Sequence, residues 1–171
     1  STSGIGEAIA SHLAAEGARI VVSGRRSERG ETVAKRIRDA GGSAGFFRAD
    51  LAVVEECRAL IDYAIESYGG VDVLVNNAGV FPRVTFEETT EELWDRLMNV
   101  NARGAFFCSQ SAVPSMRERG AGSIVNIGSG HPFGAGAGQF AYGISKGALH
   151  TMTRKMAMLL ASDLIRVNWI S

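Results

Sequence analysis

Short apolar runs and longer periodic segments take turns along this chain. Runs rich in β-branched and aromatic residues predict buried strands. They lie at Arg19–Ser23, Gly45–Arg48, Val71–Val75, Ser123–Ile127 and Leu164–Asn168. Between these runs, apolar residues return every three or four positions, which is the spacing of one helix face. Strands that alternate with helices in this way predict an α/β protein with a parallel sheet covered by helices.

The helices are predicted from this spacing and from residues that end a helix. Ile5, Ile9 and Leu13 lie four positions apart and are followed by Gly17, which is typical of a helix end. Each further helix follows a predicted strand, so the alternation is kept. These helices are predicted around Val33 and Ile37, from Val54 to Tyr68 and from Phe140 to Ala161.

A long helix is predicted after the strand at Val71–Val75. Thr89 and Glu92 have the spacing of a capping box, in which two side chains satisfy free backbone amides at a helix start. We expect the helix to begin there and to continue past Phe106. Pro114 is expected to kink or end it, because proline removes one backbone hydrogen bond and its ring clashes with the preceding turn.

The 171 residues are enough for one domain with a substantial core, and no linker or repeat divides them. The chain opens in a glycine-rich loop at Ser3–Gly6 with no strand before it, whereas a loop of this kind follows a strand. We therefore expect a preceding strand, and further chain beyond Ser171. On this interpretation residues 1–171 form a single domain that is incomplete at both ends.

Composition narrows the classes of protein to which the chain can belong. Its 18 lysines and arginines balance 18 aspartates and glutamates, so no basic surface for nucleic acid is expected. No apolar run approaches the ~18 residues of a membrane span and no signal peptide is seen, so we expect a cytoplasmic protein that does not bind membranes. Cys57 and Cys108 lie in predicted helices without metal-ligand spacing, which predicts buried thiols and no metal site.

The first candidate site is the loop that contains Gly4 and Gly6. Two glycines at a helix start let backbone amides approach an anion, and the helix dipole adds attraction, so the loop is a candidate phosphate cradle. A plain turn is the alternative. After the strand at Arg19–Ser23, Gly24 stands where an acidic residue would hold a free ribose 2′-hydroxyl, so Arg25 favours a 2′-phosphate. A solvated basic helix start explains Arg25 equally well.

The second candidate site is in the last predicted helix, where Tyr142 and Lys146 lie four positions apart and share one face. An ammonium group beside a phenol stabilises the phenolate, which lowers the tyrosine pKa from its usual ~10 and allows proton exchange near neutral pH. Ser129 follows the strand at Ser123–Ile127, and the glycine-rich loop of residues 128–138 can fold its hydroxyl toward the phenol. A loop hydroxyl that caps its own backbone is the alternative for Ser129.

Together these motifs resemble the short-chain dehydrogenase/reductase family. Ser3-Gly4-Ile5-Gly6 resembles the end of the family's glycine motif, and Asn76-Asn77-Ala78-Gly79 resembles its loop after the fourth strand. Ser129, Tyr142 and Lys146 resemble its catalytic set, and Val100-Asn101 resembles the segment that carries the fourth catalytic residue. The resemblance covers nearly the whole sequence and implies a doubly wound, Rossmann-like parallel sheet.

The resemblance also implies a role for each matching residue. Tyr142 would be the general acid/base, Lys146 would lower its pKa and hold the nicotinamide ribose, and Ser129 would orient the substrate oxygen. Asn101 would anchor a water relay to Lys146, while Asp50 would touch the adenine and Leu51 would pack beside it. The implied cofactor-binding residues are Ser3, Gly4, Ile5, Gly6, Arg25, Asp50, Leu51, Asn77, Ala78, Gly79, Tyr142 and Lys146.

The substrate is the least specified part of the prediction, because the match lacks the later segment that shapes the family's pocket. A near wall is predicted at Phe81, His131, Phe133 and Gln139, although each is also explained as an ordinary loop or packing residue. The expected partner is therefore a small molecule with a carbonyl or alcohol group. A homodimer or homotetramer formed through the long helices is implied by the family.

The predicted function is an oxidoreductase that transfers a hydride between NADP(H) and a carbonyl or alcohol carbon, with NAD as the alternative cofactor. Ketoreductase and alcohol dehydrogenase types are both open, as is reduction of a 3-oxoacyl thioester. Two rival interpretations remain. One is a dinucleotide-binding regulatory module without turnover, and the other is an inactive fragment of such an enzyme.

Overall fold

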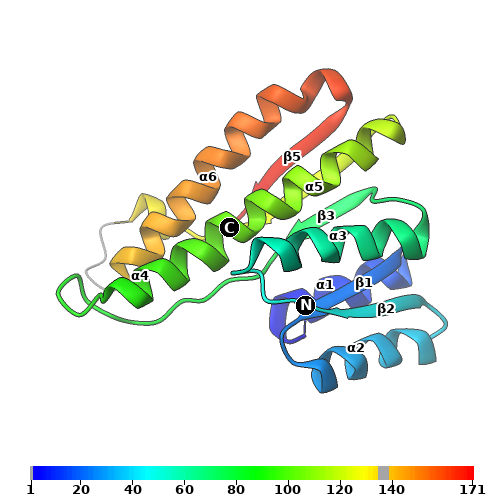
Figure 1. The fold of residues 1–171 in the computed structure, drawn as a ribbon, viewed down its shortest axis with the longest axis horizontal. Coiled ribbons are helices and arrows are strands. Elements are labelled where there is room, and N and C mark those ends of the chain that lie inside the picture. The colour runs from blue at the N-terminus through cyan, green and yellow to red at the C-terminus, as the bar shows by residue number, and fades with distance from the viewer. Residues whose placement is uncertain (1, 135–138) are drawn as a thin grey trace.

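The structure is a computed structural model, and it describes residues 2–134 and 139–171. Strands and helices alternate as the sequence predicts (Figure 1). The strands are β1 (Arg19–Gly24), β2 (Ser43–Arg48), β3 (Val73–Asn76), β4 (Gly122–Ile127) and β5 (Ile165–Ile170). The α-helices are α1 (Gly4–Ala15), α2 (Ser27–Asp39), α3 (Val54–Tyr68), α4 (Glu91–Met98), α5 (Gly104–Glu118) and α6 (Phe140–Leu160).

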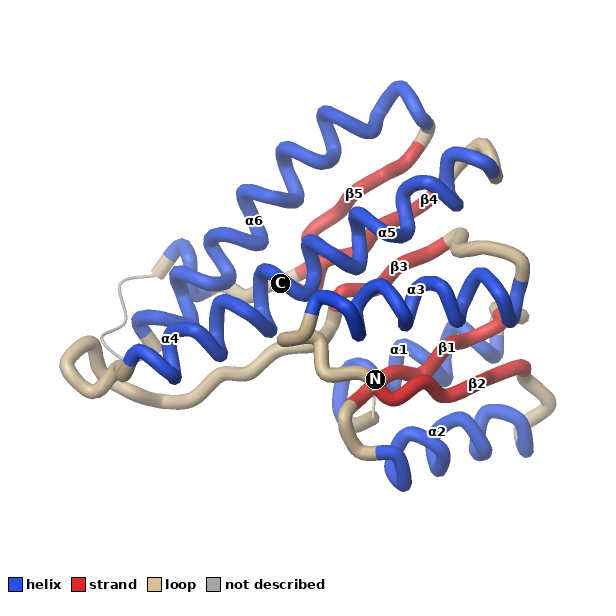
Figure 2. The backbone as a smooth tube through the Cα atoms, in the orientation of Figure 1, coloured by secondary structure: helices blue, strands red, loops and turns tan. Residues whose placement is uncertain are grey.

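All the strand pairs are parallel, which confirms the predicted α/β class. β1 pairs with β2, and β4 lies between β3 and β5, so the described strands form two sheets (Figure 2). The central position of β4 is reflected in its side chains, since Ile124 is fully buried between the register partners Leu74 and Val167. Parallel strands of this kind place their carboxyl ends at one common edge.

Each sheet has its own hydrophobic core. α1 and α2 pack on β1–β2 around Val22, whereas α3, α5 and α6 pack on β3–β4–β5 around Ile124 (Figure 1). The predicted thiols Cys57 and Cys108 belong to the second core, and both are free and buried as expected. In the part of the chain that the structure describes, no helix is long and apolar enough to cross a membrane.

A large cavity separates the facing edges of β1 and β3. Its volume is about 1170 Å³, and it is lined by consecutive residues of both strands, including Ile20 and Val21 on one side and Leu74 and Val75 on the other. The two strands do not pair with each other. The expectation that a further strand stands ahead of Ser1 stays a prediction. Beyond the carboxyl ends of β1 and β3, the same cavity opens into the candidate site.

The long predicted helix differs from expectation at its start. Thr90, not Thr89, is the N-cap, because the Thr90 hydroxyl accepts a hydrogen bond from the amide of Leu93 at 3.3 Å. The Thr89 hydroxyl instead donates to the carbonyl of Thr85 at 2.8 Å and belongs to the preceding turn. The predicted capping box of Thr89 and Glu92 is therefore wrong by one position.

The same helix also differs in its middle. A five-residue π-helical turn, Asn99–Arg103, separates α4 from α5 without breaking the helix. Pro114 does not end α5, which continues to Glu118. A proline removes one backbone hydrogen bond, whereas the buried side chains of Val113 and Met116 hold the helix on the sheet on both sides of it.

Candidate functional site

The candidate site is the part of the large cavity beyond the carboxyl ends of β1 and β3. Every residue predicted to bind the cofactor lines the cavity, which brings together segments from five parts of the chain. These residues are Ser3, Gly4, Ile5, Gly6, Arg25, Asp50, Leu51, Asn77, Ala78, Gly79, Tyr142 and Lys146. Open parallel sheets bind ligands at this edge, so the position agrees with the predicted chemistry.

The start of α1 forms one wall of the cavity. Gly4 has a φ of +57°, in the left-handed region that favours glycine, and Ser3 before it makes no side-chain cap. The first amides of a helix have no acceptor within the helix, so they are free to bind an anion, and the helix dipole adds attraction. The start of α1 has the free amides that the predicted phosphate cradle needs, and phosphate binding there stays a prediction.

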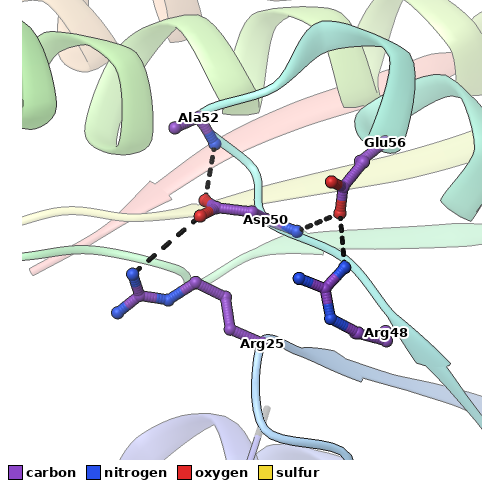
Figure 3. Close-up of polar contacts among 5 residues, drawn as sticks. All are labelled: Arg25, Arg48, Asp50, Ala52 and Glu56. Atoms are coloured by element: carbon purple, nitrogen blue, oxygen red, sulfur yellow. Dashed lines mark hydrogen bonds and ion pairs between the residues drawn. The ribbon is translucent and has the colours of Figure 1, made fainter.

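Charged residues gather at the ends of β1 and β2 (Figure 3), where Arg25 and Asp50 line the cavity. Arg25 Nη1 lies 3.9 Å from Asp50 Oδ2, and the other oxygen of Asp50 accepts from the amide of Ala52 at 3.1 Å. Glu56 accepts from the amide of Asp50 at 2.7 Å and from Arg48 at 3.4 Å. The Arg25 side chain is 57% exposed, so its guanidinium has donors left for an anion at this rim.

Tyr142 and Lys146 face the cavity together from α6. Lys146 Nζ lies 6.0 Å from the centre of the Tyr142 ring and donates to the carbonyl of Ile127 at 2.7 Å. Only 3% of Lys146 is exposed, and this burial lowers the pKa of Lys146 to about 8. The two side chains share one cavity, and the idea that the lysine assists proton exchange by the phenol stays a prediction.

Asn101 lies in the π-helical turn and is fully buried. Its amide nitrogen donates to the carbonyl of Val80 at 2.9 Å and to the hydroxyl of Ser145 at 2.9 Å, while its oxygen accepts from the amide of Val80 at 2.8 Å. A Cβ on Gly79 would lie 3.4 Å from the Asn101 oxygen and 3.6 Å from Lys146 Nζ. Asn101 therefore fixes the loop after β3 against α6, beside Lys146.

Ser129 lies just after β4, in a second hollow next to the main cavity. Its hydroxyl oxygen is 2.8 Å from Nδ1 of His131, and the ring of His131 meets the ring of Tyr142 edge-on at 5.3 Å. The imidazole therefore connects Ser129 to Tyr142. The sequence predicted His131 only as a wall residue, although its position two residues after Ser129 was the available signal.

The rest of the predicted near wall is more exposed. Phe81 and Phe133 are 68% and 67% exposed, and Phe81 meets the Tyr142 ring edge-on at 6.4 Å. Phe133 instead packs on His150, and Gln139 is the N-cap of α6. Residues 135–138 of the predicted glycine-rich loop lie outside the described residues.

A buried polar network beneath the site was missed by the sequence analysis. Asn76 on β3 donates to Asn126 on β4 at 2.8 Å and to Ser109 on α5 at 3.0 Å. Asn126 in turn donates to Thr153 on α6 at 2.8 Å. The network ties two strands to two helices. Its signal in the sequence is a pair of asparagines near the ends of two apolar strands, which become register partners only in the folded sheet.

Comparisons with known proteins agree with this arrangement. The short chain dehydrogenase family matches residues 1–171. An uncharacterized oxidoreductase of Thermotoga maritima is 36% identical over 97% of this chain, which spans 65% of that relative's length. A metagenomic short-chain oxidoreductase solved with NADP superposes with a TM-score of 0.93 at 32% identity, covering 98% of this chain and 75% of the other.

A third protein extends the comparison to a structure with a small organic molecule. Gluconate 5-dehydrogenase from Burkholderia cenocepacia, solved with NADP and tartrate, superposes with a TM-score of 0.92 at 36% identity. The match covers 98% of this chain and 66% of that one. The parallel strands and the site at their carboxyl ends define a Rossmann-like α/β protein. The chain belongs to the short-chain dehydrogenase family.

Proposed function

We propose that this chain carries the catalytic and cofactor-binding part of an NADP(H)-dependent oxidoreductase that acts on a carbonyl or alcohol substrate. The observation that supports this most is that Tyr142 and Lys146 line the same cavity as the glycine-rich start of α1. A proton-transfer pair and an anion-binding helix start in one cavity suit a reaction that joins a dinucleotide to a proton donor. Two solved proteins that resemble this chain hold NADP.

The lining residues fit a dinucleotide along the length of the cavity. The amides of Gly4, Ile5 and Gly6 would hold its diphosphate, because they start a helix and face the cavity. Asp50 and Leu51 would contact the adenine, and Arg25 would bind a 2′-phosphate at the exposed rim. Asn77, Ala78 and Gly79 would line the nicotinamide end, where a Cβ on Gly79 would be in ordinary van der Waals contact with Asn101 and Lys146.

In this proposal the residues around Tyr142 handle the proton. Bound dinucleotide supplies or accepts the hydride. Tyr142 gives a proton to the substrate oxygen during reduction and takes it back during oxidation. Lys146 holds the nicotinamide ribose and places its ammonium near the phenol. Ser129 orients the substrate oxygen, and Asn101 keeps the loop after β3 in place and anchors a water relay to Lys146.

The proposal is tested by adding NADPH or NADH and a panel of ketones to the protein and following the loss of cofactor absorbance. We expect cofactor binding, measured by fluorescence titration, and turnover of at least one ketone. Binding without turnover of any substrate favours a regulatory module. Activity that appears in a longer chain but not in the 171-residue chain favours an inactive fragment of a competent enzyme.

We also propose a cytoplasmic homodimer or homotetramer. Two free, buried cysteines suit a reducing compartment. Trp94 on α4 and Phe106 on α5 are 37% and 43% exposed, and large apolar side chains on the surface of a long helix suit a contact between subunits. Light scattering tests the assembly, and a monomer at micromolar concentration would contradict it.

A further inference from the structure

We propose that His131 is a positioning residue that sets the hydrogen-bond direction of the Ser129 hydroxyl. The proposal rests on the proposed function, in which Ser129 orients the substrate oxygen. To orient the oxygen of a ketone, or of an alcohol whose own proton goes to Tyr142, the Ser129 hydroxyl must donate its proton. The group that holds the other side of the hydroxyl therefore decides whether Ser129 can bind the substrate oxygen.

Among the described residues, two contacts hold the Ser129 hydroxyl, and both come from His131. The amide of His131 donates to Ser129 Oγ at 3.2 Å, and Nδ1 of the imidazole lies 2.8 Å from the same oxygen. A hydroxyl has one proton and two lone pairs. The backbone amide takes one lone pair, so the imidazole takes either the second lone pair or the proton.

The tautomer of His131 chooses between these two states. When Nδ1 carries the proton, it donates to Ser129, both lone pairs are filled, and the hydroxyl proton points away from His131 to a ketone oxygen. When Nε2 carries the proton, Nδ1 accepts the hydroxyl proton, and Ser129 has no proton to donate to the substrate oxygen. The state with the proton on Nδ1 therefore serves both reaction directions, because an alcohol gives its own proton to Tyr142 and accepts from Ser129 through an oxygen lone pair.

The local backbone holds the imidazole in this position. His131, Pro132 and Phe133 form a 3-10 turn, closed by a hydrogen bond from the amide of Phe133 to the carbonyl of Gly130 at 3.1 Å. The proline restricts the backbone of the turn. The edge contact at 5.3 Å between the rings of His131 and Tyr142 limits rotation of the imidazole. The proton-donating phenol and the hydroxyl are therefore held through the same ring.

The contact is tested without turnover by nitrogen NMR of the imidazoles. The chain has three histidines, so His131 is assigned by comparison with the His131→Asn variant. We expect Ser129→Ala to change the ring-nitrogen shifts of His131, which report the tautomer, while those of His12 and His150 stay the same. Unchanged His131 shifts would show that the ring does not hold the hydroxyl, and would overturn the proposal even if the enzyme is active.

The role is tested by kinetics of two substitutions, each made alone and with Ser129→Ala. His131→Leu removes the side-chain hydrogen bond, whereas His131→Asn places an amide near the position of Nδ1. We expect His131→Leu to lower kcat for ketone reduction about tenfold, the effect of one lost hydrogen bond, with unchanged NADPH affinity. His131→Asn should restore most of the loss.

The double variant with Ser129→Ala and His131→Leu shows whether His131 acts through the Ser129 hydroxyl or only stabilises the fold. In the Ser129→Ala background, His131→Leu should cost nothing further, because the hydroxyl on which it acts is gone. An equal loss in both backgrounds, or no rescue by asparagine, would overturn the proposal. His12→Asn on the exposed face of α1 is the matched control and should leave kcat unchanged. If no ketone is turned over at all, the proposed function fails. The NMR measurement still tests whether His131 bonds to the Ser129 hydroxyl.

Discussion

The two sheets meet the same cavity with different chemistry. On the side of β3–β4–β5, buried polar groups bond to one another, as in the chain from Asn76 through Asn126 to Thr153, and Lys146 is a buried amine. On the side of β1–β2, they are charged and exposed, as in the pair of Arg25 and Asp50. Leaving a buried polar group without its hydrogen bond costs about 1–3 kcal/mol, which holds such groups in place, whereas an exposed ion pair contributes about 0–1 kcal/mol.

This difference suits the two ends of the proposed dinucleotide. Proton and hydride transfer need fixed atoms, so the rigid side carries Tyr142, Lys146 and Asn101. Recognition of a phosphate needs charge more than fixed geometry, so the exposed side carries Arg25. The comparison predicts large, specific effects from changes on the first side and small, salt-dependent effects from changes on the second.

The largest effect is expected from Tyr142→Phe. Removal of the phenolic hydroxyl should lower kcat by roughly 10²–10⁴-fold, the usual contribution of a general acid, and leave cofactor affinity nearly unchanged. Steady-state kinetics and fluorescence titration measure the two quantities. Tyr63→Phe is the control, since Tyr63 packs on Phe47 away from the cavity lining. Full turnover by Tyr142→Phe would remove Tyr142 from the proton-transfer role.

The next effect concerns the pH dependence of stability through Lys146. Burial lowers the pKa of Lys146 from 10.5 to about 8, so between these values the folded protein has released a proton that the unfolded chain still holds. The free energy of unfolding should therefore rise with pH across this window, by about 3 kcal/mol relative to Lys146→Met. Denaturant titrations of both proteins measure it. If the free energy of unfolding changed with pH in the same way for both proteins, burial would not lower the pKa of Lys146.

A smaller loss is expected when the network between the strands is cut. Asn126→Ala removes the acceptor of Asn76 and the donor to Thr153, but each of those residues keeps another partner. We therefore expect a loss of about 2 kcal/mol in unfolding free energy. Asn168→Ala, on an exposed position of β5, is the matched control and should change stability by about 0.5 kcal/mol or less. Equal losses of unfolding free energy in the two variants would show that the hydrogen bonds of Asn126 do not stabilise the fold.

The smallest effect is expected at the exposed rim. Arg25→Ala should weaken NADP binding by about fivefold and leave NAD binding unchanged, because the lost contact is a solvent-exposed ion pair. The difference between wild type and variant should shrink as salt is added. Titrations of both cofactors at low and high salt measure it. Arg29→Ala, outside the cavity lining, is the control. If the preference for NADP over NAD were unchanged in Arg25→Ala, Arg25 would not bind the 2′-phosphate.

The sequence predicted what is local and missed what depends on partners far along the chain. Strands were visible because β-branched runs such as Arg19–Ser23 favour a strand from their own composition, and the candidate glycine loop was visible because Ser3–Gly6 is one continuous motif. The hydrogen bond from Asn76 to Asn126 joins residues 50 positions apart. Only the sheet register brings them together, so no local pattern contains it.

Errors of one position have a similar cause. Thr89 and Thr90 are both good cap residues, and the choice between them depends on the turn that delivers the chain from Thr85. The orientation of His131 was likewise hidden, because the same residue type at the same position also suits a packing role. Tertiary contacts with Ser129 and Tyr142 decide it.

The π-helical turn at Asn99–Arg103 changes the direction in which the side chains of α4 face relative to those of α5. Each residue of an α-helix turns the chain by about 100°, so one residue more or less changes which side every later residue faces. A π turn spreads an extra residue over the same hydrogen-bonded helix. Deleting one residue from Asn99–Arg103 would return the helix to regular winding and twist α4 away from α6 by about a quarter of a revolution. With the π turn, one continuous helix both buries Leu97 and brings Asn101 within hydrogen-bond distance of Ser145.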